Sequence, residues 1–396
     1  MRVAIIGQGY VGLTIAVGAA GAGHNVVGFD LNQDLVGRLN SGKSHIEGIS
    51  DSNLAGFISS GLFTTSTDPS VLEGSDVIVI AVPTPIDGDR NPDLSFVNAA
   101  ADLINQQVKT PALIINESTS YPGTLRNEIA SRITGLGHLF ASSPERVDPG
   151  NTKWGTKNTP RLIGGLTPAA VAKAKEFYGS FCDSIIEVSS PEVAEAAKIF
   201  ENTFRQVNIA LVNEFAQISD ALGISSREVI EAAATKPYGF MPFNPGPGVG
   251  GHCIPVDPSY LAHVANEVGV PATFIKRANE VNLAMPAYVV KRVVAGAGGL
   301  ITGKSVVVVG VSYKANVADT RETPAAAVID LLRAEGADVV WHDDLVGNWR
   351  GESSTPMNGF DIAVVVTKHE GVRDAAIKAS GYVFDCTGTV AGVDGI

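Results

Sequence analysis

The sequence is poor in cysteine, in long hydrophobic runs and in basic charge, and each shortage excludes a class of protein. Its 396 residues hold only three cysteines, Cys182, Cys253 and Cys386, too few and odd in number for a disulfide framework, so we expect a reducing, cytoplasmic compartment. Apolar runs such as 77–82 and 306–309 are far shorter than the roughly 20 residues that span a bilayer. The apolar start of the chain is also too short for a signal-peptide core, so we expect neither export nor a membrane partner.

Basic charge is outweighed by acidic charge, with 29 Lys and Arg against 41 Asp and Glu, a formal net charge of −12. Such an excess repels a phosphate backbone, so nucleic acid is not an expected partner. Because the seven histidines show no metal-ligand spacing, we expect no metal site. The length and the 45% hydrophobic content predict a folded protein of two to three domains.

The amino-terminal segment has the pattern strand, glycine turn, helix, strand. Gly7 permits a tight turn, Gly9 lets a pyrophosphate approach the helix start at Tyr10 and Val11, and Gly12 permits close packing of helix on strand. Asp30 follows the second apolar run, where a carboxylate holds a ribose 2′-hydroxyl and repels a 2′-phosphate. The pattern favours NAD over NADP. A glycine-rich turn in an unrelated βαβ unit is the alternative.

Two further apolar runs, 77–82 and 112–115, end in polar loops. Ligands of open α/β sheets bind beside such carboxyl ends. Thr84, Glu117 and Thr119 are therefore candidate site residues, although each alone is more often a satisfied loop residue.

The carboxyl-terminal quarter repeats the amino-terminal pattern in the runs 304–310, 338–343 and 361–367, but lacks the glycine fingerprint. It therefore binds a different nucleotide or serves as scaffold. Between the two repeats, a helical pattern opens at Ser190-Pro191-Glu192 and closes at Gly223 after Leu222. The fold class is α/β, with two doubly wound Rossmann-like domains joined by a central helical segment that contains one long helix. The expected domains are 1–189, 190–297 and 298–396, with the long helix as the dimerisation surface.

Three segments of the sequence contain candidate catalytic or ligand-binding residues. Cys253 lies in a glycine- and proline-rich loop, 244–258, where a thiol is accessible, although a free cysteine is more commonly a buried small hydrophobe. Lys198, Asn202 and Arg205 share one face of the long helix at spacing i, i+4, i+7, although a solvated face is the default. The polar stretch from Tyr313 and Lys314 to Arg321 is a candidate phosphate pocket.

With these residues assembled, the chain resembles the UDP-glucose/GDP-mannose dehydrogenase family over essentially its whole length. The motifs that carry the resemblance are Gly7 to Gly12, Val82-Pro-Thr-Pro85, Glu117 to Thr124, Ser143-Pro-Glu-Arg146, Lys198 with Asn202, Gly250-Gly-His-Cys253, and Gly310 to Lys314 through Arg321-Glu322. The resemblance implies oxidation of the C6 hydroxymethyl of a nucleotide sugar to a carboxylate, with two NAD per turnover. The product implied is a precursor of cell-surface polysaccharide.

The resemblance also implies roles for individual residues. Cys253 would attack the aldehyde to give a thiohemiacetal and then a thioester, with Lys198 and Asn202 stabilising the oxyanion. A base, or a water held by Lys198 and Asp257, would take the C6 hydroxyl proton, while Thr119 and Glu145 would position the hydrolytic water and the cofactor. Further substrate contacts would come from Arg146, Val147, Arg205, Gly250, Tyr313 and Lys314, and Arg321 would meet the NAD pyrophosphate.

The sugar is predicted from two stretches. Ser-Pro-Glu-Arg146 and the sequence around Cys253 resemble the branch that acts on UDP-N-acetylhexosamines, and the stretch 235–243 is similar to that of UDP-N-acetylglucosamine 6-dehydrogenases. UDP-N-acetylmannosamine is also possible. The alternatives are UDP-glucose, a two-electron dehydrogenase that needs neither Cys253 nor Lys198, and a non-catalytic NAD- or UDP-sugar-binding sensor.

The sequence departs from the family pattern at three positions. Leu35 stands where relatives often have an arginine over the adenosine, and Asn244 where the acetylglucosamine branch commonly has tyrosine. The segment Asp385-Cys386-Thr-Gly lacks the arginine that many relatives carry after the last strand, so one UDP contact is not accounted for.

Overall fold

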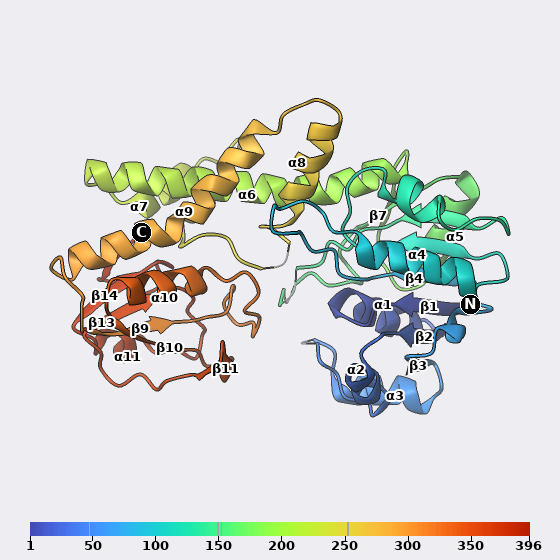
Figure 1. The fold of residues 1–396 in the computed structure, drawn as a ribbon, viewed down its shortest axis with the longest axis horizontal. Coiled ribbons are helices and arrows are strands. Elements are labelled where there is room, and N and C mark those ends of the chain that lie inside the picture. The colour runs from blue at the N-terminus through green and yellow to red at the C-terminus, as the bar shows by residue number, and fades with distance from the viewer. Residues whose placement is uncertain (47, 149, 152, 252) are drawn as a thin grey trace. The chain divides into compact units, whose positions relative to one another are not determined.

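The structure is a computed structural model that describes residues 1–46, 48–148, 150–151, 153–251 and 253–396. Its contacts divide the chain into two compact units. Unit 1 comprises Met1–Glu201 and Ser259–Gly269, and unit 2 comprises Asn202–Pro258 and Val270–Ile396. Each unit is built on its own largely parallel sheet with helices packed on it (Figure 1), which confirms the predicted α/β class.

Unit 1 contains an eight-stranded sheet. In spatial order its strands are β3 (Phe63–Ser66), β2 (Asn25–Phe29), β1 (Arg2–Ile6), β4 (Val77–Ile80), β5 (Leu113–Asn116), β6 (Leu139–Ser142), β7 (Arg161–Gly165) and β8 (Ile185–Glu187). The first six are parallel in the order 3-2-1-4-5-6 of a doubly wound nucleotide-binding sheet. Strand β7 runs antiparallel to β6, a reversal that the sequence pattern did not indicate.

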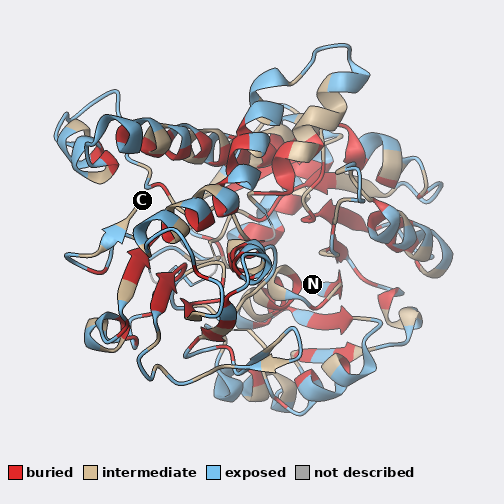
Figure 2. Cartoon of the chain, turned by 60° about the vertical axis from the view of Figure 1, so that its left-hand side comes forward, coloured by how far each residue is buried: buried red, intermediate tan, exposed pale blue. Residues whose placement is uncertain are grey.

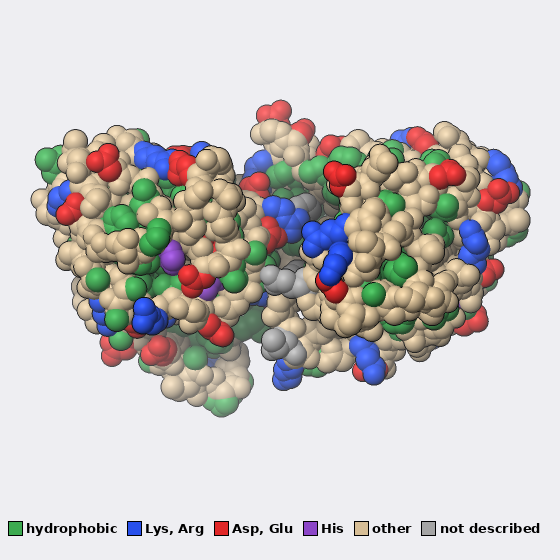
Figure 3. Space-filling model, turned by 90° about the horizontal axis from the view of Figure 1, so that it is seen from below, with side chains coloured by type: hydrophobic (Ala, Val, Ile, Leu, Met, Phe, Trp, Pro, Cys, Tyr) green, Lys and Arg blue, Asp and Glu red, His purple; other side chains and the backbone are tan. Residues whose placement is uncertain are grey.

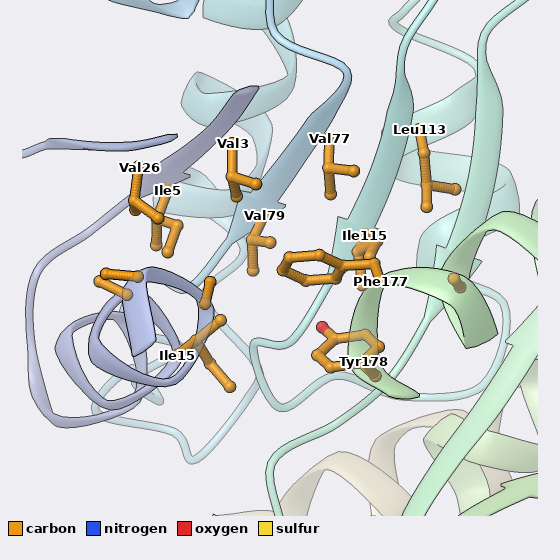
Figure 4. Close-up of a cluster of buried hydrophobic side chains, with 14 of the residues drawn as sticks. Val3, Ile5, Ile15, Val26, Val77, Val79, Leu113, Ile115, Phe177 and Tyr178 are labelled. Atoms are coloured by element: carbon orange, nitrogen blue, oxygen red, sulfur yellow. The ribbon is translucent and has the colours of Figure 1, made fainter. Parts of the chain in front are cut away.

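The core of unit 1 forms where apolar strands meet apolar helix faces. Val3, Ile5 and Val79 are fully buried on β1 and β4, and the aromatic rings of Phe177 and Tyr178 pack against the same sheet (Figure 4). The central strands β4 and β5 are buried along their whole length and β1 after its first residue, whereas the helices are buried along one side (Figure 2). This is why the strands read as continuous apolar runs rather than alternating ones.

Several helices of unit 1 begin at residue types that are favoured at helix starts. The helices of this unit are α1 (Tyr10–Gly21), α2 (Gln33–Asn40), α3 (Asp51–Ser59), the 3₁₀ turn η1 (Pro69–Leu72), α4 (Ser95–Gln107), the π-helical turn η2 (Leu125–Ala130) and α5 (Pro168–Gly179). Side chains of Asn32, Ser50 and Thr167 cap α2, α3 and α5 by accepting backbone hydrogen bonds.

The long helix predicted from Ser190 to Leu222 is α6 (Pro191–Leu222). It begins in unit 1 and continues into unit 2. Proline in its first turn and Gly223 at φ +70° after its last residue supply the expected start and stop.

Unit 2 contains the second Rossmann-like sheet, in the spatial order β10 (Asp338–His342), β9 (Ser305–Val309), β13 (Ile362–Val365), β14 (Tyr382–Asp385) and β15 (Asp394–Gly395). All its pairings are parallel, as the repeated pattern predicted. Its other elements are α7 (Ser226–Ala234), α9 (Thr273–Gly296), α10 (Pro324–Ala334), α11 (Asp374–Lys378) and the short pair β11 (Asn348–Trp349) and β12 (Glu352–Ser353). Helix α8 (Asp257–Glu267) starts in unit 2 and passes into unit 1.

Acidic and basic side chains are interspersed on the face of each unit seen in Figure 3. No helix among the described residues is long and apolar enough to cross a membrane. Nor do the described His, Cys, Asp and Glu side chains gather in any group of three or more that could hold a metal ion.

Candidate active site

The glycine turn of unit 1 joins β1 to α1 at the middle of the sheet. Gly7 has φ +90°, and a side chain there would overlap the carbonyl of Ala81. A methyl group on Gly12 would overlap the carbonyl oxygen of Gly7. Glycine is therefore required at both positions by the packing of α1 on β1 and β4.

Gly9 differs from the other two glycines because a Cβ at this position would meet nothing within 4 Å. No side chain caps α1, and its first turn, which starts at Tyr10 and Val11, contains no acidic residue. The amino end of α1 is therefore open to an anion, which backbone N–H groups and the helix dipole would attract.

Asp30 follows β2 beside the glycine turn. Its Oδ2 accepts a hydrogen bond from the backbone N–H of Gln8 at 2.8 Å, and its Oδ1 accepts one from Asn32 at 2.9 Å. Each carboxylate oxygen keeps a further lone pair. The half-buried carboxylate can therefore accept hydrogen bonds from a ribose next to the turn.

The loops after β4 and β5 lie together at the same edge of the sheet. Ser118 Oγ accepts a hydrogen bond from the N–H of Val82 and donates one to its carbonyl oxygen, both at 2.9 Å. The predicted residues Thr84 and Thr119 stand on these two loops, Thr84 buried and Thr119 half-buried. Both candidate residues therefore lie at the ligand-binding edge of a doubly wound sheet.

Behind these loops lies a buried ionic cluster that the sequence analysis identified only in part. Arg161, at the start of β7, donates to Glu117 at 2.6 Å and to Glu145 at 2.8 Å. The hydroxyl of Tyr178 also donates to Glu117. Glu145 Oε1 accepts backbone hydrogen bonds from Arg146 and Val147.

The two carboxyl groups of this cluster have opposite pKa shifts. Burial raises the pKa of Glu117 to about 7, against the opposing effect of Arg161. At Glu145 burial acts in the same direction, but Arg161 and the backbone N–H donors outweigh it and lower the pKa below its ordinary value. Glu145 is therefore ionised at neutral pH, while Glu117 titrates near neutrality.

Arg146 and Val147 follow the cluster in sequence. The Arg146 guanidinium forms an ion pair with Glu201 of α6 at 2.5 Å and donates to the carbonyl of Pro160 at 2.8 Å. A ligand anion that approaches Arg146 would therefore compete with Glu201. Val147 is half-buried.

The predicted helix face on α6 carries three side chains with different exposure. Lys198 is half-buried, Asn202 is buried and Arg205 is exposed. Asn202 belongs to unit 2, where its Nδ2 donates to Oδ2 of the buried Asp257 at 2.5 Å. The structure thus brings Asn202 and Asp257 together, 55 residues apart in sequence.

Cys253 is exposed, whereas Cys182 and Cys386 are buried, and none of the three is in a disulfide. The carbonyl oxygen of Cys253 accepts hydrogen bonds from the N–H groups of Val256 at 3.1 Å and Asp257 at 2.8 Å. This turn leads directly into α8 and places Cys253 four residues before Asp257. The neighbouring histidine, residue 252, lies outside the described residues.

The cysteine loop packs on the loop of residues 313–321, which follows β9. A Cβ on Gly250 or Gly251 would lie 2.8 Å from side-chain atoms of Tyr313, and the Gly251 N–H donates to the carbonyl of Arg321 at 3.0 Å. The guanidinium of Arg321 pairs with Asp319 at 2.5 Å. Tyr313 and Lys314, both half-buried, therefore belong to a loop that directly supports the cysteine loop.

The charge of the Arg321 guanidinium interacts with the charge of a Cys253 thiolate. The pKa of Arg321 is raised mainly by the hydrogen bond to Asp319, and the negative charge of a Cys253 thiolate raises it further. The guanidinium and the thiol are therefore close enough for their charges to interact, and the thiolate is the form of a cysteine that reacts.

Arg227 of α7 lies against the segment that follows β14. Its guanidinium donates to the carbonyl oxygens of Cys386 at 2.9 Å and Ile396 at 3.0 Å, and a side chain on Gly388 would overlap it. It lines a cavity of about 260 Å³ with Asp385 and the ion-paired Arg292. Of the residues predicted from the sequence to form the site, none lines this cavity.

Comparison with known proteins places these features in a family. Residues 1–182 match the NAD binding domain of the UDP-glucose/GDP-mannose dehydrogenase family, residues 192–284 match its central domain, and residues 307–391 match its UDP binding domain. The chain belongs to this family. It is an NAD-dependent nucleotide-sugar dehydrogenase, as the motifs around Gly7 and Cys253 predicted.

Named relatives cover nearly the whole chain. A UDP-N-acetyl-D-mannosamine dehydrogenase of Pyrococcus horikoshii is 35% identical over 96% of this chain and 92% of its own. A UDP-N-acetyl-D-glucosamine 6-dehydrogenase of Pseudomonas aeruginosa is 35% identical over 96% and 90%. The solved structure of a UDP-D-ManNAc dehydrogenase from P. horikoshii has a TM-score of 0.90 at 32% identity and covers 100% of this chain and 99% of that one.

The glycine turn of this family member fits NAD. The space above Gly9 and the uncapped start of α1 accommodate a pyrophosphate, and the Asp30 carboxylate lies beside the turn. A side chain at position 9 would occupy the space that the pyrophosphate needs. These residues would hold the dinucleotide, as in other doubly wound sheets.

The sequence analysis missed Arg161, Tyr178 and Arg227. An arginine that opens a buried apolar run, Arg161-Leu-Ile-Gly, was the available indication of an internal ion pair, because a charge is rarely buried without a partner. No comparable pattern marks Tyr178 or Arg227, whose partners lie 61 and 159 residues away.

Proposed function

We propose that this dehydrogenase oxidises the C6 hydroxymethyl of a UDP-N-acetylhexosamine to the carboxylate, with two NAD per turnover. The observation that carries the proposal is the exposed Cys253 thiol in a turn that ends at Asp257, which Asn202 contacts. A two-electron alcohol dehydrogenase needs no such nucleophile. An exposed thiol four residues before a carboxylate that an amide contacts suits covalent oxidation of an aldehyde.

The proposed reaction balances in four steps. The C6 alcohol loses a proton and a hydride to give the aldehyde, and the Cys253 thiolate adds to its carbonyl carbon, forming a C–S bond. Loss of a second hydride from that carbon leaves a thioester, and water then breaks the C–S bond to release the acid and the thiol. NAD, when bound, accepts one hydride in each oxidation, so one alcohol and one water yield one carboxylate, two NADH and three protons.

Asn202 is assigned to the oxyanion that forms when the thiolate adds. One N–H of its amide donates to Asp257, and an amide carries two such donors. We assign the second to the oxyanion, together with the ammonium of Lys198, one helical turn earlier on α6. Asp257, with Lys198, is assigned to hold the water or base that takes the C6 hydroxyl proton.

Thr119 and Glu145 are assigned to the hydrolytic water and to the cofactor. Glu145 supports this assignment as a hydrogen-bond acceptor for water, because its lowered pKa keeps the carboxylate ionised. Its contacts with Arg161 and with two backbone N–H groups hold it in one orientation. Thr84 is assigned to the same NAD edge.

The UDP-sugar contacts are assigned from the family resemblance together with the local geometry. The assigned residues are Arg146, Val147, Arg205, Gly250, Tyr313 and Lys314, with Arg321 on the NAD pyrophosphate. We add Arg227 of α7, because its guanidinium contacts the segment after β14, which has no arginine of its own. Three segments, 1–189, 190–297 and 298–396, are proposed as NAD-binding, central and UDP-sugar-binding domains.

Two sugars are candidates. The stretch 235–243 favours UDP-N-acetylglucosamine, and the P. aeruginosa relative is named for that sugar. UDP-N-acetylmannosamine is favoured by the name of the P. horikoshii relative and its solved structure. UDP-glucose is the remaining alternative.

The assembly and location are proposed as a cytoplasmic homodimer. Cysteines outside disulfides support a reducing compartment. Helix α6 carries exposed apolar side chains, among them Phe204 and Leu211, and these support pairing of two chains.

The deciding experiment counts NADH formed per sugar with limiting UDP-N-acetylglucosamine, UDP-N-acetylmannosamine, UDP-N-acetylgalactosamine and UDP-glucose in parallel. We expect two NADH per N-acetylhexosamine. Two NADH with UDP-glucose alone would replace the substrate but keep the mechanism. One NADH per sugar would refute the role of Cys253, and none with any sugar would indicate a sensor.

A further inference from the structure

Three neighbouring strands of unit 2 end at the same edge of the sheet. The order β10, β9, β13 is parallel, so their carboxyl ends lie side by side. Asp343 follows β10, the 313–321 loop follows β9, and His369 follows β13. Strand order therefore brings together three segments that are distant in sequence.

Asp343 is a buried anchor at this edge. Its Oδ2 accepts hydrogen bonds from the N–H groups of Val311 and Ser312 and from the Ser312 hydroxyl, at 2.9 to 3.2 Å. Its Oδ1 accepts two more, from Leu345 and Val346. These donors satisfy a carboxylate with no exposed surface, which keeps the side chain fixed and ionised.

His369 links this anchor to the 313–321 loop. The histidine is 2% exposed, its Nε2 lies 3.0 Å from Asp343 Oδ1, and its Nδ1 lies 2.8 Å from the backbone nitrogen of Asn316. A backbone N–H can only donate, so Nδ1 is the acceptor and the ring proton is on Nε2, directed at Asp343. The ring therefore has one tautomer and one orientation.

Asn316 is held in an unusual conformation by this contact. Its φ is +62°, in the left-handed region that asparagine tolerates better than most residues. Its Oδ1 accepts a hydrogen bond from the N–H of Glu370 at 3.0 Å. The tip of the loop is thus attached twice to the segment after β13.

We propose that His369 is a positioning residue, which fixes the 313–321 loop in the conformation that binds the UDP portion of the substrate. The inference rests on the proposed function, because Tyr313 and Lys314 of this loop are assigned to the UDP-sugar. The loop also accepts the Gly251 N–H at the Arg321 carbonyl. His369 therefore supports the cysteine loop only through the 313–321 loop, and it does not contact substrate itself.

A matched pair of variants separates the two hydrogen bonds of the ring. His369→Gln keeps an Nε2–H that reaches Asp343 but offers no acceptor to Asn316. His369→Asn offers an Oδ1 in place of Nδ1 but no donor to Asp343. Hydrogen exchange read by mass spectrometry should show faster exchange at the Asn316 amide in H369Q than in wild type, with H369N close to wild type.

Steady-state kinetics tests the consequence for substrate. In H369Q the KM for the UDP-sugar should rise between about five-fold and about a hundred-fold, the range expected when a buried N–H loses its acceptor, while kcat changes less. H369N should restore the KM to near the wild-type value. Equal KM values in wild type and H369Q, or equal loss in H369Q and H369N, would overturn the proposal.

Two measurements do not require turnover and separate this proposal from the proposed function. Binding of UDP alone, measured by calorimetry, should weaken in H369Q and not in H369N even if the sugar assignment is wrong. In the wild-type protein, before any ligand is added, the Asn316 amide should exchange more slowly than the amides of the exposed neighbours Ala315 and Ala318. Equal exchange at these amides would overturn the proposal without any variant.

Discussion

At the residue scale, burial and hydrogen bonding give neighbouring carboxyl groups different protonation behaviour. Glu195 on α6 is fully buried, and its carboxylate accepts the N–H groups of Gly123 at 2.7 Å and Leu125 at 2.9 Å. Burial raises its pKa to about 8 despite these donors. Glu192, one turn earlier, has its pKa lowered because hydrogen bonds from Arg126 and Ser190 outweigh burial. Glu192 and Glu195 therefore allow the link between a shifted pKa and the pH dependence of stability to be tested within one helix.

Glu195→Gln should make unfolding less dependent on pH. The pKa of Glu195 is about 8 in the folded chain and near 4.5 in the unfolded chain. Between these values the folded state holds a proton that the unfolded state releases, so the free energy of unfolding falls as pH rises, by at most about 1.4 kcal/mol per pH unit. The difference in Tm between E195Q and wild type should therefore become more positive from pH 5 to pH 8.

The control is Glu192→Gln, whose effect on Tm should stay constant across that range because the lowered pKa keeps Glu192 ionised throughout it. Glu117, with a pKa of about 7, retains part of the pH dependence in both variants. Parallel Tm curves for wild type and E195Q would show that the Glu195 carboxyl is not perturbed.

Cys253→Ser should retain binding of both ligands and lose the second oxidation. A serine hydroxyl is far less ionised and less nucleophilic than a thiol, so formation of the acid should fall by at least about a thousand-fold. Rapid-quench analysis of the products, with calorimetry for UDP binding, measures both effects. Full four-electron turnover by the serine variant would refute the assignment, and Cys253→Ala serves as the control without any nucleophile.

At the scale of elements, α6 carries a continuous apolar stripe on its surface. Phe200, Phe204, Leu211, Ile218 and Leu222 are between 42% and 67% exposed. At 100° per residue they fall within an arc of about 40°. Five large apolar side chains aligned along one helix are more than the scattered exposed residues of an ordinary surface, and they fit pairing with the same stripe of a second copy.

Leu211→Asp should convert a dimer to a monomer. Leu211 is at the centre of the stripe, and an isologous interface places an introduced charge near the charge of its partner. Light scattering coupled to gel filtration measures the mass. Leu300→Asp is the matched control, because Leu300 is 68% exposed against 62% for Leu211 and lies outside α6. An unchanged mass for L211D, or an equal change for L300D, would exclude this stripe as the interface.

At the scale of the whole molecule, each unit has its own sheet edge formed by the carboxyl ends of parallel strands, which is where ligands of doubly wound sheets bind. We assign NAD to the glycine turn after β1 in unit 1 and UDP to the 313–321 loop after β9 in unit 2. The second unit replaces the glycine fingerprint with an aromatic and a basic residue, Tyr313 and Lys314. The same architecture can therefore serve two ligands of different shape.

NADH and UDP should protect different segments from hydrogen exchange. NADH should slow exchange at the start of α1, while UDP should slow exchange in the 313–321 loop. Gly9→Val is expected to fold, because a Cβ there meets nothing within 4 Å at an ordinary φ of −68°. It should abolish the NADH effect at α1 and leave the UDP effect intact. Protection of unit 1 by UDP alone would contradict the assignment of the two edges.

The sequence by itself determined the features that depend on local residue types. Buried parallel strands, the glycine turn at Gly7, the long helix from Pro191 to Leu222 and the exposed thiol of Cys253 were all predicted, because periodicity, turn chemistry and helix punctuation act over a few residues. The motif order also predicted the family.

Only the tertiary structure decided which polar groups meet. Because β7 runs antiparallel to β6, Arg161 at its start lies between Glu117 and Glu145. The strand order in unit 2 likewise brings His369 to Asn316, 53 residues away. Such pairings follow from strand order and chain reversal, which no local pattern specifies. Their energies depend on burial, and burial exists only once distant segments have packed together.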